Sequence, residues 1–87
     1  MNTRKIIGIN LKYLRYTANK SQEEFYHNLG LSYKYLASVE RGEVNITVNF
    51  LDDLAKRLNI NVSDLVTFDE AKVIQDKRYD SKRVEIK

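Results

Sequence analysis

The 87-residue sequence contains no cysteine and no proline, and its only histidine is His27. Without cysteine, the chain can form neither a disulfide scaffold nor a thiolate metal site. With one histidine, we expect no zinc site of an ordinary ligand count. No apolar run approaches the roughly 20 residues that cross a bilayer, and the first residues do not resemble a signal peptide. These absences favour a cytoplasmic protein without membrane contact.

Motifs of catalysis are also absent from the sequence. It has no phosphate-binding glycine loop and no Gly-x-Ser-x-Gly elbow. The adjacent carboxylates of Asp52 and Asp53 would point in different directions on a helix, which suits a solvated face better than acid–base catalysis. We therefore expect no enzyme and no cofactor.

The length and an apolar content of 43% allow one compact domain. The net charge is +3, and residues 1–20 hold five basic side chains and no acidic one. Such an uneven distribution suits an anionic partner, but a solvated helix face explains it equally well. Charge alone leaves both interpretations open.

Residues 3–18 are predicted to form a first helix with Thr3 as its N-cap. Gly8 weakens a helix interior, so we expect close packing against a neighbour to compensate for it. The apolar stripe of this helix consists of Ile7, Leu11, Leu14 and Ala18, and the other faces carry Asn10, Lys12 and Tyr13.

A second helix is predicted to begin after Ser21, which forms a capping box with Glu24. Phe25 and Leu29 make its apolar stripe, and Gly30 ends it because glycine enters a left-handed turn freely.

A third helix is predicted to follow a short turn that contains Leu31. Ser32 caps this helix, Leu36 and Val39 point inward, and Gly42 ends it.

Two more helices complete the predicted fold. Thr47 is the expected cap of a fourth helix with a wide apolar face, and Ser63 is the expected cap of a short fifth helix. Short polar links join the five, so the fold class is all-α, a compact five-helix domain.

We divide the chain into a helix-turn-helix domain at residues 1–68, with the motif at 22–41, and a C-terminal extension at residues 69–87. The extension could begin as an amphipathic helix capped by Asp69. The alternating pattern at residues 83–87 suits either a half-buried strand or a frayed terminus.

The second and third helices have the proportions of a DNA-reading motif. Both are about two turns long, and the turn of three residues between them begins with glycine. Their apolar positions fix the crossing and leave one face of the third helix free for a major groove. That face is expected to carry Tyr33, Lys34, Ala37, Ser38 and Arg41.

Residues 7–65 resemble the lambda-repressor-like, Xre/Cro-type helix-turn-helix family of DNA-binding regulators. The resemblance covers about two thirds of the chain. It rests on Ile7-Gly8, Leu11, Leu14-Arg15, Ser21-Gln22-Glu23-Glu24-Phe25, Gly30-Leu31-Ser32, Tyr35-Leu36, Val39-Glu40-Arg41-Gly42, Asn45 through Leu51, Leu54-Ala55, Leu58, and Val62 to Leu65.

The resemblance implies roles for matching positions. Candidate base contacts are Tyr33, Lys34 and Ser38. Candidate phosphate contacts are Gln22, Ser32, Tyr35, Arg41 and Asn45. The alternative is a solvated polar face, and at Tyr35 support of the fold is the stronger interpretation.

The resemblance also implies a structural ion pair between Arg15 and Glu40 that locks the first helix to the third. Tyr26 departs from the family, which usually has alanine at this position. Its ring should crowd the helix crossing unless it slides outward or the third helix moves. His27 is expected to be exposed.

The function that this resemblance implies is that of a sequence-specific regulator, a repressor that binds a palindromic operator on double-stranded DNA as a homodimer. The dimer interface candidates are Leu65, Val66, Phe68, Val73 and Ile74. A monomer is the alternative. An antitoxin, or another protein-interaction module that binds a protein through the tail, is the alternative function.

Overall fold

The computed structural model describes residues 2–77 of the chain. Within this range every regular element is helical, which agrees with the all-α fold class. A further helical segment covers residues 70–77. The five labelled helices are α1 (Thr3–Thr17), α2 (Gln22–Asn28), α3 (Tyr33–Glu40), α4 (Val48–Leu58) and α5 (Val62–Val66).

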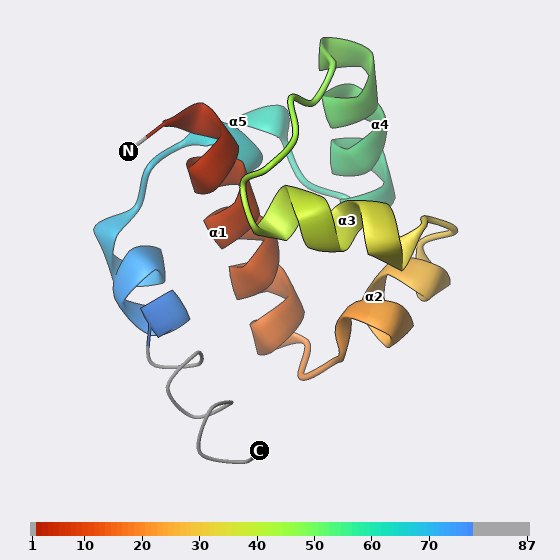
Figure 1. Cartoon of the computed structure of the whole chain (residues 1–87), viewed down its shortest axis with the longest axis horizontal. Helices are drawn as coiled ribbons and strands as arrows, with labels where there is room; N and C mark the ends of the chain where they lie inside the picture. Colours follow the sequence, from red (N-terminus) through yellow and green to blue (C-terminus); the bar gives the residue numbers. More distant parts are fainter. Residues whose placement is uncertain (1, 78–87) are drawn as a thin grey trace.

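The helix α1 lies next to both α3 and α5 (Figure 1). It contacts α3 on one side and α5 on another, while α2 packs on α3 and α4 packs on α5. The segment at residues 70–77, blue in Figure 1, returns to lie beside α1. None of the helices in the described part of the chain is long and apolar enough to cross a membrane.

Side chains cap the N-termini of most of these helices, and three of the N-cap residues are the ones expected from the sequence. Ser21 forms the capping box with Glu24: its hydroxyl accepts the Glu24 N–H at 3.2 Å, and its own N–H donates to the Glu24 carboxylate at 3.4 Å. Ser32 caps α3 and Thr47 caps α4 by accepting the backbone N–H of Tyr35 and Phe50, without a capping box. At the far end of α2, Gly30 has a φ of +73°, the left-handed conformation that a side chain would strain.

Two expected caps are wrong by one or two positions. The N-cap of α1 is Asn2, whose side-chain oxygen accepts the Lys5 N–H at 3.0 Å, so Thr3 is already inside the helix. The N-cap of α5 is Asn61 rather than Ser63, and the Asn61 N–H donates to the carboxylate of Asp64 at 3.0 Å. In both cases asparagine precedes the expected residue and has the extended backbone that a cap requires.

One cluster of side chains from all five helices forms the core. Partly buried apolar residues surround it, among them Leu14, Phe25 and Leu29. The buried members of the cluster are Ile7, Leu11, Tyr26, Leu36, Val39, Leu54, Ala55 and Leu65.

The burial pattern corrects three expectations. Leu65 is fully buried, at 0% exposure, so it belongs to the core and cannot lie in a dimer interface. Ala37 is also buried and does not lie on the free face of α3. Ala18 is exposed because α1 ends at Thr17, so it does not extend the apolar stripe.

Asn10, which was expected on a face outside the apolar stripe of the first helix, is buried, with an exposure of 2%. Its side-chain amide donates to the backbone oxygen of Leu65 at 2.7 Å and to that of Thr67 at 3.1 Å. Both N–H groups are therefore satisfied, as burial of a polar group requires. The amide fastens α1 to the C-terminal end of α5.

The segment at residues 70–77 begins as expected, with the Asp69 carboxylate accepting the Ala71 N–H at 3.0 Å. An ion pair of 3.0 Å between Lys12 and Asp76 holds it against α1. Its exposed apolar side chain is Ile74. The alternating pattern at residues 83–87 lies outside the described residues, and the domain division at residue 69 stays a prediction.

Gly8 allows α1 and α3 to approach closely, as its place inside a helix suggested. A Cβ atom at this position would overlap the backbone oxygen of Glu40 and lie 2.8 Å from that of Val39. Backbone atoms cannot swing aside as a flexible side chain can, so any larger residue must push the two helices apart.

Gly8→Ala should therefore lower the free energy of unfolding by about 1–3 kcal/mol, as overpacking does. The loss should appear even though alanine favours a helix interior by up to about 1 kcal/mol over glycine. Urea denaturation measures the change, with Arg4→Ala at an exposed position of α1 as the control. A Gly8→Ala protein as stable as the wild type would show that the contact is looser than described.

Candidate nucleic-acid interface

The helix α3 is held firmly on one side and left open on the other. Leu36 and Val39 are almost completely buried against the core. On the opposite side Tyr33 and Lys34 are exposed at the first turn. One side of α3 is therefore packed against the core, and its N-terminal end presents a polar and aromatic surface.

The expected base contacts differ in how free their side chains are. The side chains of Tyr33 and Lys34 make no hydrogen bond or ion pair with the part of the chain that the structure describes. Ser38 is half-buried, and its hydroxyl donates to the Lys34 backbone oxygen at 3.4 Å and accepts from Arg41 at 3.1 Å. Ser38 would have to exchange these weak contacts before it could meet a base.

The expected phosphate contacts of α3 and the loop that follows lie on the surface. Arg41 is exposed and forms an ion pair with Glu43 at 3.0 Å, and this hydrogen bond raises the pKa of the guanidinium. Such an exposed pair is weak, so a phosphate can replace the carboxylate. Asn45 is exposed in the loop before α4.

Two other expected phosphate contacts already serve the fold. The hydroxyl of Ser32 accepts the Tyr35 N–H as the cap of α3. The ring of Tyr35 meets that of Phe50 edge-on, with 5.3 Å between centroids, although the side chain remains 39% exposed. The geometry at Tyr35 agrees with the structural interpretation and leaves its surface accessible.

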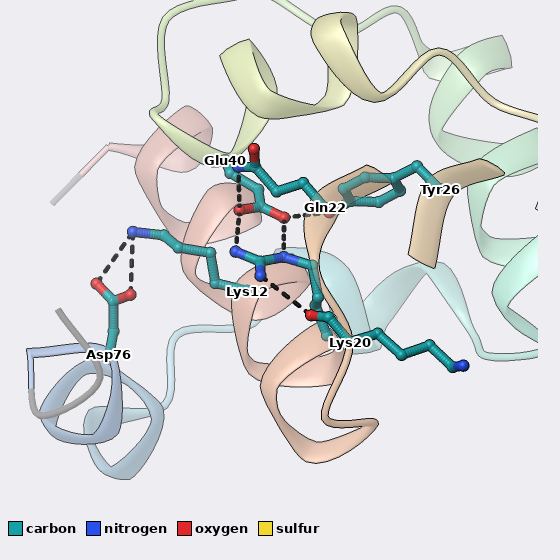
Figure 2. Close-up of polar contacts among 7 residues, drawn as sticks. Lys12, Lys20, Gln22, Tyr26, Glu40 and Asp76 are labelled. Carbon is teal, nitrogen blue, oxygen red and sulfur yellow. Dashed lines mark hydrogen bonds and ion pairs between the residues drawn. The ribbon is translucent and has the colours of Figure 1, made fainter. Parts of the chain in front are cut away.

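The carboxylate of Glu40 lies at the centre of a buried network that joins three helices (Figure 2). Arg15 of α1 donates to both oxygens, with Nε 2.9 Å from Oε2 and Nη2 2.8 Å from Oε1. Two residues of α2 complete it: Gln22 Nε2 donates to Oε1 at 3.0 Å, and the Tyr26 hydroxyl donates to Oε2 at 2.5 Å. Arg15 and Glu40, expected to pair, are each only 4% exposed.

The protonation states of this network follow from its geometry. Burial works to raise the pKa of Glu40, but the hydrogen bonds from Arg15, Tyr26 and Gln22 outweigh it and hold the pKa below the ordinary value of 4.5. Burial and the Glu40 charge raise the pKa of the Tyr26 phenol. Glu40 is therefore ionised and Tyr26 protonated at neutral pH, so each donor faces a charged acceptor.

The ring of Tyr26 does not slide outward, which was one of the two expected ways to avoid crowding at the helix crossing. A shift of α3, the other way, stays a prediction. The ring is fully buried and meets Phe25 edge-on, with 5.2 Å between centroids. Tyr26 follows Gln22 by one helical turn, so both donors leave the same side of α2 and reach the same carboxylate. Two features of the sequence indicate this contact. Gln22 and Tyr26 are four residues apart, and Tyr26 lies in the helix that precedes Glu40, a member of the expected ion pair.

Two smaller findings concern metals and histidine. No group of three or more histidine, aspartate or glutamate side chains within residues 2–77 could hold a metal ion. His27 is exposed on α2, as expected.

Residues 11–65 match a protein-family model described as helix-turn-helix. The HTH-type transcriptional regulator y4dJ of Sinorhizobium fredii is 42% identical over 77% of this chain and 87% of its own. The control protein C.SmaI of Serratia marcescens is 40% identical over 77% of this chain and 80% of its own. A hypothetical transcription factor, NHTF, from Neisseria has a similar fold, with a TM-score of 0.70, 24% identity and 85% coverage of both chains.

Removal of the central carboxylate by Glu40→Ala should lower the free energy of unfolding by about 3–5 kcal/mol at neutral pH, because it strands the buried charge of Arg15. The folded-state pKa of Glu40 is lowered, so its contribution is complete above the ordinary pKa of 4.5 and is lost as the pH falls through the lower folded value.

Urea denaturation of both proteins over a range of pH measures this effect. The stability difference between wild type and Glu40→Ala should be constant above pH 6 or so and shrink in acid. Equal stability at neutral pH would contradict a structural role for the pair.

Proposed function

Because the chain belongs to the Xre-like helix-turn-helix family of DNA-binding transcriptional regulators, we propose that it is a repressor that binds a palindromic operator as a dimer. The observation that carries this proposal is the pair of unpartnered side chains, Tyr33 and Lys34, on a rigidly seated α3. In this proposal the protein acts in the cytoplasm by binding DNA and catalyses no reaction.

In the proposed complex the first turn of α3 enters the major groove. The Lys34 ammonium is placed to donate to O6 and N7 of a guanine. Tyr33 offers a hydroxyl and an apolar ring edge that fits a thymine methyl group. Ser38, one turn further along α3, would give the third base contact after releasing its present partners.

Contacts to the sugar-phosphate backbone would fix the register of α3 in the groove. We assign them to Gln22 at the start of α2, to Arg41 at the end of α3 and to Asn45 in the loop that follows. Ser32 and Tyr35 are secondary candidates because both already support the fold. Gln22 and Tyr33 line one open groove of about 380 Å³ between α2 and α3, which supports their joint contact with one DNA strand.

A second copy of the chain would double the small number of base contacts. Two-fold pairing would place the half-sites about one helical turn apart on a palindromic operator. With Leu65 assigned to the core, the candidates are Val66, Phe68, Val73 and Ile74. Phe68 and Ile74 are 53% and 48% exposed, so both offer apolar surface that a second copy could cover.

The names of the relatives favour a regulator over an antitoxin. C.SmaI is a control protein, as is a further similar protein, C.BamHI from Bacillus amyloliquefaciens. The third, y4dJ, is an HTH-type transcriptional regulator. Control of gene expression is therefore the proposed role.

Selection from a random pool of DNA duplexes should enrich one palindromic sequence, and affinity for it should fall steeply as salt rises, because phosphate contacts release counterions.

Lys34→Ala should relax the preference at one base position, with a loss of about 1–3 kcal/mol in binding free energy for the preferred base. Gln22→Ala should instead weaken all sequences alike and leave the salt dependence unchanged, since it removes no charge. No enriched sequence, or an affinity independent of salt, would contradict the regulator proposal.

Ile74→Asp should shift the protein from dimer to monomer in sedimentation equilibrium and should weaken binding to the selected palindrome. A charge on the exposed apolar surface would oppose burial between two copies. Val48→Asp, at the most exposed of the large apolar side chains on the described surface, is the matched control and should leave the mass unchanged. A wild-type protein that sediments as a monomer would contradict the dimer.

A further inference from the structure

The Glu40 carboxylate accepts four hydrogen bonds, two on each oxygen. Oε1 accepts from Arg15 Nη2 and Gln22 Nε2, and Oε2 accepts from Arg15 Nε and the Tyr26 hydroxyl. A carboxylate has about four lone-pair sites, so Glu40 is saturated. Each donor excludes the others from its own site.

The saturated carboxylate determines which way the Gln22 amide faces. An ionised carboxylate only accepts hydrogen bonds, so the amide must turn its nitrogen, not its oxygen, towards Oε1. A primary amide has two N–H groups, and Glu40 takes one of them. The second remains for a partner at the mouth of the groove that Gln22 shares with Tyr33.

Tyr26 decides whether that second N–H stays available. Without the phenol, Oε2 would keep a vacant lone pair in a buried site, where an unmet hydrogen bond is costly. Arg15 also has N–H groups to spare, but it already donates to both carboxylate oxygens and, at 3.3 Å, to the Lys20 backbone oxygen, whereas the Gln22 side chain makes a single bond, to Oε1. The amide would then turn inward to serve both oxygens and would lose its outward donor.

We propose that Tyr26 is a positioning residue for DNA: by occupying Oε2 of Glu40 it leaves Gln22 with one N–H on Oε1 and the other directed at a backbone phosphate. This inference rests on the proposed function and assigns to a core residue a part in DNA affinity. Tyr26 itself does not touch DNA, since its side chain is fully buried.

The test is a double-mutant cycle of Tyr26→Phe and Gln22→Ala, with a short mixed-sequence DNA duplex as the probe at several salt concentrations. Phenylalanine keeps the ring that fills the core and removes only the hydroxyl. Each single variant should bind about threefold to tenfold more weakly than wild type, which is the effect of one hydrogen bond. The double variant should bind no more weakly than Gln22→Ala, because Tyr26 acts only through Gln22.

Two controls separate positioning from stability. Ile7→Val makes a small core cavity away from Gln22 and should bind like wild type while folded. All proteins are measured with trimethylamine N-oxide, which keeps a weakened variant folded. The Gln22 side-chain amide resonances should also shift in free Tyr26→Phe, as seen by NMR.

Three results would overturn the inference: Tyr26→Phe that binds like wild type, a loss that adds in full to that of Gln22→Ala, or unshifted Gln22 amide resonances. A wild-type protein without salt-sensitive binding to the duplex would instead overturn the proposed function. The two failures are distinguishable because the first set of results requires a wild type that binds DNA.

Discussion

The buried charge of Glu40 is the constraint on which the arrangement of the first three helices depends. An ionised carboxylate in a core is stable only when donors surround it, and here the donors come from α1 and α2. Because α3 carries the acceptor, the donor of α1 and the two donors of α2 fix the position of α3 relative to both helices. The absence of a side chain at Gly8 brings α1 near enough for this arrangement. The same constraint that holds the core together therefore sets the position of α3.

Local patterns were enough to predict the helices, because caps and apolar spacing act within a few residues. The capping box of Ser21 and Glu24 and the left-handed Gly30 are such cases. Some errors are local, since two N-caps and the end of α1 differ from the expected positions by one or two residues. The larger errors concern residues whose environment is set from far along the chain. Tyr26 depends on an acceptor 14 residues away, and Asn10 on one 55 residues away. Leu65 was misassigned because a five-residue helix is too short for its periodicity to show which side faces the core.

The candidate site was predictable to a similar extent. The sequence placed Tyr33 and Lys34 on an outward surface, and the structure leaves both exposed. It could not show that Gln22 has an internal partner, since that contact requires the angle between α2 and α3. A residue type can indicate a capacity to bind DNA, but the geometry of neighbouring helices decides how many of its donors remain for that purpose.

The two hydrogen bonds between the Asn10 side chain and the end of α5 also affect the order in which the helices can pack during translation. The backbone oxygens of Leu65 and Thr67 accept these bonds. The helix α1 is translated before both residues, so it cannot complete this contact until residue 67 has been translated. The contacts between α2 and α3, in contrast, join neighbours and can form as soon as both helices have left the exit tunnel. Of the described helices α1 is translated first, yet its contacts are complete only when those of α5 are.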